Sequence, residues 1–224
     1  MRTKIYQINR DRDSNRVKFT GLGGLERFQG SAAVDSSLYD EVFNADIDEV
    51  DLEAIYSRFN QDKHPLFQGH SLSVSDVVVN DNGAFFCDSV GFKSIEFDES
   101  QTQKPEGLMK IVYVEPHRAP FEAEIPNTLE AEQQAVMGYI EPIYNEDGTC
   151  LVGNEEAKLI GMDGNRHLDY GGVLAGPFFV CGTTEEEFCG LTDEQVDKYL
   201  EKYHEIEEIS PEEVQADTGF VFYF

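Results

Sequence analysis

The sequence contains no tryptophan, only 17 lysine and arginine residues, and no long apolar run. A helix that crosses a membrane needs about 18 or more consecutive apolar residues, and no stretch approaches that length. Residues 1–13, MRTKIYQINRDRD, also lack the apolar core of a secretory signal peptide. We therefore expect a cytoplasmic protein that has no membrane partner.

Cysteine is scarce as well, and its spacing argues against two common uses. The four cysteines form no CxxC pair and show no Cys/His spacing typical of a zinc site. Reduced thiols are therefore expected, and no metal or other cofactor is predicted. The four residues are Cys87, Cys150, Cys181 and Cys189.

The charge balance is the strongest signal in the composition. Against the 17 basic residues stand 44 aspartates and glutamates, so the formal net charge is −27. Such a charge disfavours direct binding to nucleic acid or anionic membranes and favours a basic protein partner. Residues 1–108 hold 11 basic and 19 acidic side chains (net −8), whereas residues 109–224 hold 6 and 25 (net −19). This asymmetry predicts two modules.

The first module shows both strand and helix patterns. Apolar alternation predicts an opening hairpin of residues 4–10 and 16–22, and glycines bound a short helix at 23–30. A second helix is predicted to bury a face made of Leu52, Ile55, Tyr56 and Phe59. The NDNG turn at 80–83 predicts a hairpin of strands 77–79 and 84–88, and residues 92–97 predict one more strand.

The second module begins after a polar, turn-rich stretch at residues 98–108, which predicts a linker. Strands are predicted at 108–116 and 122–125, and a helix at 127–139 that Asn127 or Thr128 caps. Two strands around an Asp-Gly turn follow at 140–159, then a buried strand at 176–182. The last helix, 192–206, has Thr192 as its N-cap, and residues 209–224 predict a β-prone tail.

The predicted fold class is therefore α+β. Two small domains, each a mainly antiparallel sheet with one or two packed helices, occupy residues 1–97 and 109–208. The linker at 98–108 separates them, and the tail at 209–224 follows.

Residues 69–79, GHSLSVSDVVV, invite a catalytic interpretation. Ser71, Ser73 or Ser75 could be a nucleophile that His70 and Asp76 assist, but the segment has no GxSxG elbow. Adjacent side chains of one segment also cannot all converge on one point. We favour a structural motif, in which the aspartate binds backbone N–H groups in a turn and the valines open a strand.

The second module holds one weaker candidate site. Asn154, Glu155 and Glu156 supply polar groups that could combine with Asn165 and Arg166. A metal site or an acid/base pair is one interpretation. A solvated turn with a capping side chain is the favoured one.

Two stretches resemble known families. IYSRFN, GHSLSVSDVVV and DSVGF resemble the YodL-like domain over about residues 3–97. Residues 109–206, with the blocks NEE, NR and AGPFFVCG, resemble a small domain of unknown function that often accompanies it. The resemblance implies a protein of conjugative elements or phages, with a role in blunting host defence. It carries over no catalytic residues, and the segment from Ile209 onward lies outside both resemblances.

Three functions remain open. The first is a non-enzymatic accessory protein of a mobile genetic element, an antirestriction-type acidic DNA mimic that occupies a basic surface of a host or element protein. The second is a small enzyme that uses the Asn154–Arg166 residues, and the third is a structural adaptor bound through the apolar tail. The predicted contacts of the first are acids within 35–53 and 185–213, above all Asp46, Asp48, Glu49, Asp51, Glu185, Glu186, Glu187, Glu212 and Glu213.

Overall fold

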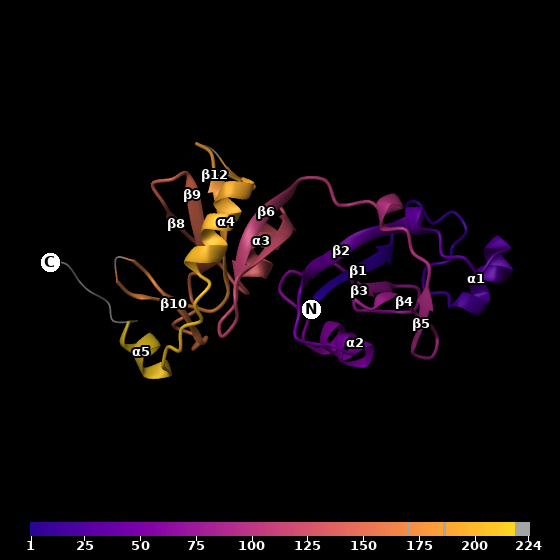
Figure 1. The fold of residues 1–224 in the computed structure, drawn as a ribbon, viewed down its shortest axis with the longest axis horizontal. Helices are drawn as coiled ribbons and strands as arrows, with labels where there is room; N and C mark the ends of the chain where they lie inside the picture. Colours follow the sequence, from indigo (N-terminus) through magenta and orange to yellow (C-terminus); the bar gives the residue numbers. More distant parts are fainter. Residues whose placement is uncertain (170, 186, 218–224) are drawn as a thin grey trace. The chain divides into compact units, whose positions relative to one another are not determined.

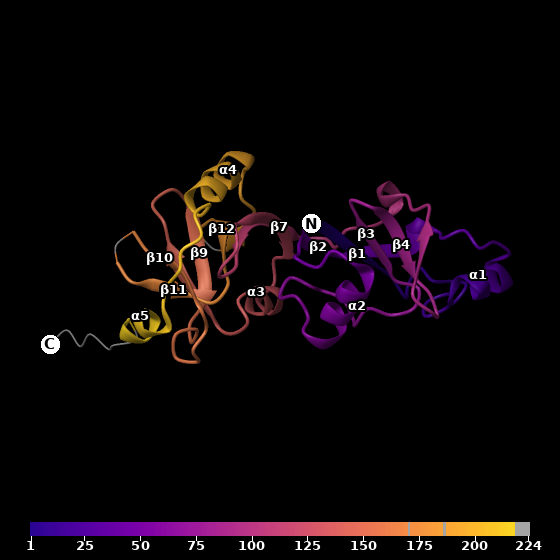
Figure 2. The same cartoon turned by 60° about the horizontal axis from the view of Figure 1, so that its bottom comes forward.

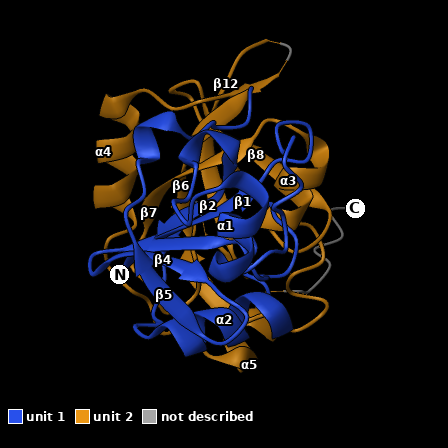
Figure 3. Cartoon of the chain, turned by 90° about the vertical axis from the view of Figure 1, so that its right-hand side faces the viewer, with its two compact units in different colours: residues 1–106 blue, residues 107–224 orange. Residues whose placement is uncertain are grey.

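The computed structural model describes residues 1–169, 171–185 and 187–217 and divides the chain into two compact units. The units are Met1–Glu106 and Gly107–Phe224, drawn in different colours in Figure 3. Each has its own antiparallel sheet and a few helices, which confirms the predicted α+β class. Within the described part of the chain, every helix is too short or too polar to cross a bilayer.

The first unit is built on a five-stranded sheet with the order β2-β1-β3-β4-β5. Its strands are β1 (Arg2–Ile8), β2 (Tyr39–Asp46), β3 (Val77–Asn80), β4 (Gly83–Cys87) and β5 (Phe92–Ile95). The hairpin predicted at the NDNG turn is confirmed, because β3 pairs with β4 in the register Asn80↔Gly83. Gly83 has a φ of +123°, which a residue with a side chain rarely adopts.

The predicted opening hairpin is wrong. Strand β1 pairs with β2 and β3, and residues 16–22 form no strand. The reason is local, because the Asp13 carboxylate accepts hydrogen bonds from the backbone N–H groups of Val17 and Lys18. The backbone also enters the left-handed region at Arg16 and Phe19, which ends any extended run.

The helices of the first unit are α1 (Leu22–Gln29) and α2 (Leu52–Gln61), with short 3-10 turns η1 (Ser36–Leu38) and η2 (Glu99–Gln101). Asp51 caps α2 by accepting from the Ala54 N–H. Ile55 and Phe59 are fully buried, and the Phe59 ring lies 4.8 Å from that of Phe43 on β2. Tyr56, predicted on the buried face, is instead 39% exposed.

Most of the predicted linker belongs to the first unit. Glu99 of η2 accepts hydrogen bonds from Lys4 Nζ and Tyr6 Oη of β1. Gln103 exchanges backbone hydrogen bonds with Tyr39 and Glu41 of β2. These contacts with the sheet explain why a polar stretch folds as part of the unit. At the other end of the stretch, β6 already begins at Leu108.

The second unit contains a six-stranded sheet with the order β7-β6-β12-β9-β8, in which β13 also pairs with β12. Strands β6 (Leu108–Val114) and β7 (Phe121–Pro126) form one hairpin, and β8 (Ile140–Tyr144) and β9 (Thr149–Asn154) form another, as predicted. The predicted strand β12 (Phe178–Thr183) lies between the hairpins and is almost wholly buried. Strand β13 is Phe188–Cys189, and β10 (Gly164–His167) and β11 (Val173–Ala175) form a separate ribbon.

The helices in the described part of the second unit are α3 (Leu129–Ala135), α4 (Asp193–Lys202) and α5 (Pro211–Ala216). Thr128 caps α3, and Thr192 with Gln195 forms a capping box on α4, which confirms both predicted starts. Val196 and Tyr199 of α4 pack in the core with strands β6 and β12. The helix predicted at 127–139 is shorter in the structure, and Leu129 and Tyr139 are exposed.

The predicted β-prone tail is wrong where the structure describes it. Ile209 is buried, Ser210 caps α5, and Pro211 occupies the first turn, a position that suits its fixed φ. Figures 1 and 2 both show α5 beside the β10–β11 ribbon, away from α4. Residues 218–224 of the predicted tail lie outside the described residues.

Candidate functional site

The GHSLSVSD segment at residues 69–76 forms a turn that leads into β3. Leu72 is buried and Val74 is half-buried, and neither residue lies in a strand. Ser75 has a φ of +82°, and the Asp76 carboxylate binds the backbone N–H of Ser73. The segment therefore curls on itself, and the strand begins only at Val77.

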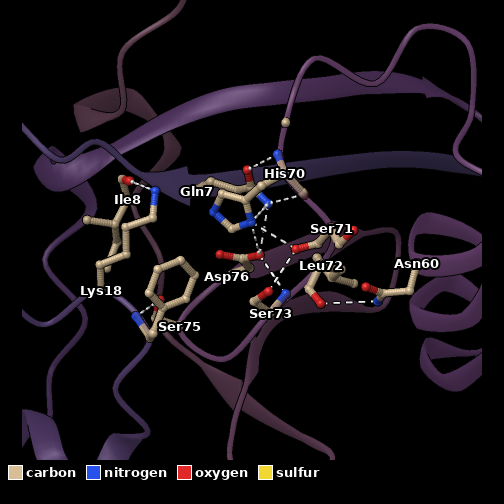
Figure 4. A network of polar contacts seen from close by, with 12 residues as sticks. Gln7, Ile8, Lys18, Asn60, His70, Ser71, Leu72, Ser73, Ser75 and Asp76 are labelled. Carbon is tan, nitrogen blue, oxygen red and sulfur yellow. Dashed lines mark hydrogen bonds and ion pairs between the residues drawn. The ribbon is translucent and has the colours of Figure 1, made fainter.

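Asp76 is the centre of a polar network that joins this turn to β1 and is shown in Figure 4. Its Oδ2 accepts hydrogen bonds from Gln7 Nε2 at 2.9 Å and from the Ser73 N–H at 2.8 Å. Gln7 Nε2 also donates to the His70 carbonyl, and Gln7 Oε1 accepts from the His70 N–H. One glutamine of β1 thus holds both the aspartate and the backbone of the turn.

The electrostatics of the network follow from its burial. Asp76 is fully buried, and this desolvation raises the pKa of its carboxyl to about 7, although hydrogen bonds from Ser73 and Gln7 and the charge of Lys18 act in the opposite direction. Among the described residues, Asp76 Oδ1 has no hydrogen-bond partner. The network therefore holds a carboxyl group whose neutral form is favoured by burial.

His70 does not take the role of a base toward a serine. Its Nδ1 lies 2.8 Å from the Ser71 carbonyl oxygen, a contact that requires a proton on Nδ1. Burial lowers the pKa of the ring, and Nε2 is buried without a partner among the described residues. The hydroxyl of Ser73 donates to the Ser71 carbonyl, and that of Ser75 accepts from the Phe19 N–H. These contacts support the structural interpretation of the motif.

The residues of the weaker candidate site form hydrogen bonds with different segments of the second unit. Asn154, at the end of β9, donates to the carbonyls of Val136 and Met137 after α3 and accepts from the Glu156 N–H. Glu155 and Glu156 are exposed. This asparagine acts as a connector between a strand and the end of a helix.

Asn165 and Arg166, on β10, bind a different set of carbonyls. Asn165 Nδ2 donates to Val114 and Gly176. The guanidinium of Arg166, only 1% exposed, donates to the carbonyls of Asn165, Tyr203 and Arg118. Over the described ranges, no three histidine, cysteine or acidic residues are grouped so that they could hold a metal ion.

The acidic residues predicted as contacts in the first unit are largely used by the fold. Asp46 lies 3.7 Å from Arg2, and Glu49 lies 3.8 Å from Arg58. Asp51 is the N-cap of α2. Asp48 is exposed. This part of the chain therefore presents less unbalanced charge than its sequence indicates.

The second unit keeps a larger excess of exposed acidic side chains, and all six of its basic side chains are already engaged. Arg166 is buried against carbonyls, and the other five form ion pairs: Lys110–Asp193, Arg118–Glu115, Lys158–Asp217, Lys198–Asp147 and Lys202–Asp169. Among the described acidic residues of this unit, only Glu132 is buried.

The predicted contacts in this unit are mostly at the surface. Glu185, Glu187, Glu212 and Glu213 are exposed, and Glu213 contacts His167. Glu186 lies outside the described residues. Helix α4 adds Glu194, Asp197 and Glu201, which are exposed. We call these three residues the α4 acidic face.

Comparison with known families agrees with the two units. Residues 2–97 match the family model of the YodL-like domain. The first unit carries a YodL-like domain. Residues 109–204, in the second unit, match the model of a domain of unknown function, DUF3846. No curated protein and no solved structure matched the chain in these comparisons.

The YodL-like domain therefore includes the whole Asp76 network. Sequence reasoning singled out His70 and Asp76 but missed Gln7, which lies 69 residues from Asp76. The only signal was a polar residue in the otherwise apolar end of a strand, at a position that the structure buries. Lys18 was also missed, and its ammonium group donates to the Ile8 carbonyl beside the network.

Three of the four cysteines, Cys87, Cys150 and Cys181, are buried, and Cys189 is half-buried. Cys150 and Cys181 oppose each other across β9 and β12, and all four cysteines are free. Burial raises the pKa of Cys87 to about 12 and that of Cys150 to about 11. Thiols with such pKa values are poor nucleophiles at neutral pH.

Proposed function

We propose that this protein is a non-enzymatic accessory protein of a mobile genetic element, located in the cytoplasm, whose DUF3846 unit binds a basic protein as an acidic DNA mimic. The target is a DNA-binding surface of a host defence or replication protein. One observation carries the proposal: every basic side chain of the unit is paired or buried, whereas its acidic side chains are almost all at the surface.

Physical chemistry supports a role of this charge in association. At physiological salt the field of exposed charges extends about 8 Å before it is screened. Such a field steers a basic partner into contact and raises the association rate more than the final affinity. It also repels nucleic acid, so the expected ligand is a protein that normally binds DNA.

The α4 acidic face offers a plausible geometry for such mimicry. Its residues are three and four positions apart, so they share one side of the helix. A rise of 1.5 Å per residue places them about 4.5–6 Å apart along the axis, compared with about 3.4 Å per phosphate along one DNA strand. A groove that accepts a DNA strand could therefore meet a comparable row of negative charges.

The test begins with capture of a partner from a host lysate on the immobilised full chain, followed by kinetics with the purified partner. We expect the association rate to fall steeply as salt rises and DNA to compete for the same site. The triple variant Glu194→Gln, Asp197→Asn, Glu201→Gln should slow association and reduce the salt dependence. A partner whose binding responds to neither salt nor DNA would rule out mimicry.

A matched variant in the other unit separates local from general charge effects. The set Asp46→Asn, Asp48→Asn, Glu49→Gln, Asp51→Asn removes a similar charge from the YodL-like domain, and asparagine preserves the cap of α2. We expect this set to slow association less than the triple variant. An equal or larger effect would move the binding surface to the first unit.

The two other functions have less support. The side chains of the proposed enzyme site bind separate backbone carbonyls, so they do not converge on one reacting atom. The apolar end of the tail that an adaptor would use, residues 219–224, lies outside the described residues.

A further inference from the structure

Residues 205–217 form a segment that lies beyond the DUF3846 match and packs on the β10–β11 ribbon. Ile209 and Val214 are buried in a small cluster with Ala157, Val173 and Ala175. Burial of these two branched side chains supplies the apolar part of the attachment of the segment. Polar contacts add to it.

The main polar contact is His167 of β10, which lies between two glutamates of the segment. Its Nε2 lies 2.8 Å from Glu213 of α5, and its Nδ1 contacts Glu207. A neutral imidazole carries one N–H and can donate to only one of these carboxylates, whereas the imidazolium donates to both. The geometry is therefore that of a protonated histidine, and the two carboxylates raise its pKa above the ordinary value.

Other charged groups also lie around the segment. Lys158 pairs with Asp217 at 2.5 Å, and Asp217 also accepts from the Val173 N–H. Arg166, adjacent to His167 on β10, is also within the field of Glu207.

His117 is a second, looser contact of the same kind. Its ring nitrogens lie 3.7 Å from Asp163 and 3.6 Å from Glu208, beyond hydrogen-bond distance. The ring borders a groove of about 690 Å³ between residues 158–164 and the segment. Its ring therefore holds the segment less closely than that of His167 does.

We propose that residues 205–217 are a pH-sensitive latch, closed on the β10–β11 ribbon while His167 is protonated. The proton binds more tightly when the latch is closed, because only then do both glutamates face the ring. The contribution of the histidine is therefore complete below about pH 6.5, its value in the open state, and is lost as the pH rises through the higher value of the closed state. Opening exposes the apolar side of β11 and frees the segment's carboxylates. The latch does not depend on the proposed function.

The test is hydrogen exchange of the full chain between pH 5.5 and 8.5, corrected for the intrinsic effect of pH on exchange. In the unaltered protein, protection of residues 205–217 should fall about fivefold over this range, as expected for two exposed ion pairs. Protection of β12 should stay constant. Constant protection of the segment across the whole range would overturn the latch.

Two substitutions at one position sharpen the test. His167→Arg stays charged and should keep the segment protected at every pH, whereas His167→Gln stays neutral and should show the lower protection at every pH. If both variants retain the pH profile of the unaltered protein, His167 does not control the latch. His117→Gln, with its longer contacts, is the matched control and should reduce the change only slightly.

An independent readout is the pKa of His167 measured by NMR in the double variant Glu207→Gln, Glu213→Gln. We expect it to fall toward the ordinary value, because the two carboxylates that stabilise the imidazolium are neutral. This measurement remains decisive even if the segment opens in the variant. An unchanged and raised pKa would show that other groups hold the proton.

Discussion

Each unit buries a charged side chain beside its antiparallel strands, and the two side chains, Asp76 and Arg166, are accommodated in opposite ways. The YodL-like domain buries Asp76, whose second oxygen has no partner among the described residues. The DUF3846 unit buries Arg166, whose guanidinium donates to three backbone carbonyls. A carboxylate can lose its charge by binding a proton, whereas a guanidinium cannot, so only the arginine requires a full set of partners.

The two units also differ in how far their acidic side chains are balanced by basic ones. The first unit distributes 11 basic and 19 acidic residues, and its acids pair with arginine or cap a helix at several of the predicted positions. The second unit has 6 and 25, and all six cations are used. The comparison predicts that pH acts on the interior of the first unit and on the surface of the second.

The largest expected effect is in the DUF3846 unit. Arg166→Met removes the donor to three backbone carbonyls and should lower the free energy of unfolding by about 3–5 kcal/mol. Exchange of the amides of β12 in the full chain measures this loss. Arg118→Met, which removes a partly exposed ion pair with Glu115, is the control and should cost about 1 kcal/mol or less. Equal losses would mean that the buried guanidinium has no special role.

The next effect concerns pH and the YodL-like domain. The folded pKa of Asp76, about 7, lies above its ordinary value, 3.8, so the folded state binds the proton more tightly. The contribution of Asp76 to stability is therefore complete below about pH 4 and is lost as the pH rises through about 7, with a total change of up to about 4 kcal/mol.

Asp76→Asn tests this effect directly, because the amide keeps the shape of the protonated carboxyl without its charge. We expect the stability of the variant, measured by hydrogen exchange of the β3 amides, to be nearly independent of pH between 4 and 8. At pH 8 the variant should be more stable than the unaltered protein. If the unaltered domain is instead more stable at pH 8 than at pH 5, groups other than Gln7, Ser73 and Lys18 stabilise the charged form of Asp76.

A smaller effect should distinguish the two cores. Val77 of β3 and Val180 of β12 are both fully buried, so each substitution by alanine should cost roughly 1–3 kcal/mol in its own unit. Val79, half-buried, is the control for the first unit and should cost less. Exchange measured in both units reports whether each loss stays local. A Val77→Ala variant that loosens β12 as much as β3 would contradict two separate cores.

The smallest expected effect is none. Ser71, Ser73 and Ser75 should not react with a phosphonate probe of serine hydrolases, because their contacts are with backbone groups of the turn and its neighbours. Mass spectrometry of the treated protein checks this expectation. Stoichiometric labelling at one of the three serines would restore the catalytic interpretation.

Local rules accounted for much of the fold. The NDNG turn, the caps at Thr128 and Thr192, and the two hairpins of the second unit were all predicted from short stretches of sequence. They were predictable because turn and cap residues bind backbone groups only a few positions away. The opening hairpin failed for the same reason, since Asp13 formed a different local turn.

The sequence by itself determined the two families, the α+β class and the excess of acidic residues. Only the tertiary structure decided which acids remain unbalanced, that Gln7 meets Asp76, and that His167 lies between Glu207 and Glu213. These contacts join residues 40 to 69 positions apart. The pairing of strands and the docking of the C-terminal segment bring them together, and no local spacing in the chain encodes those distances.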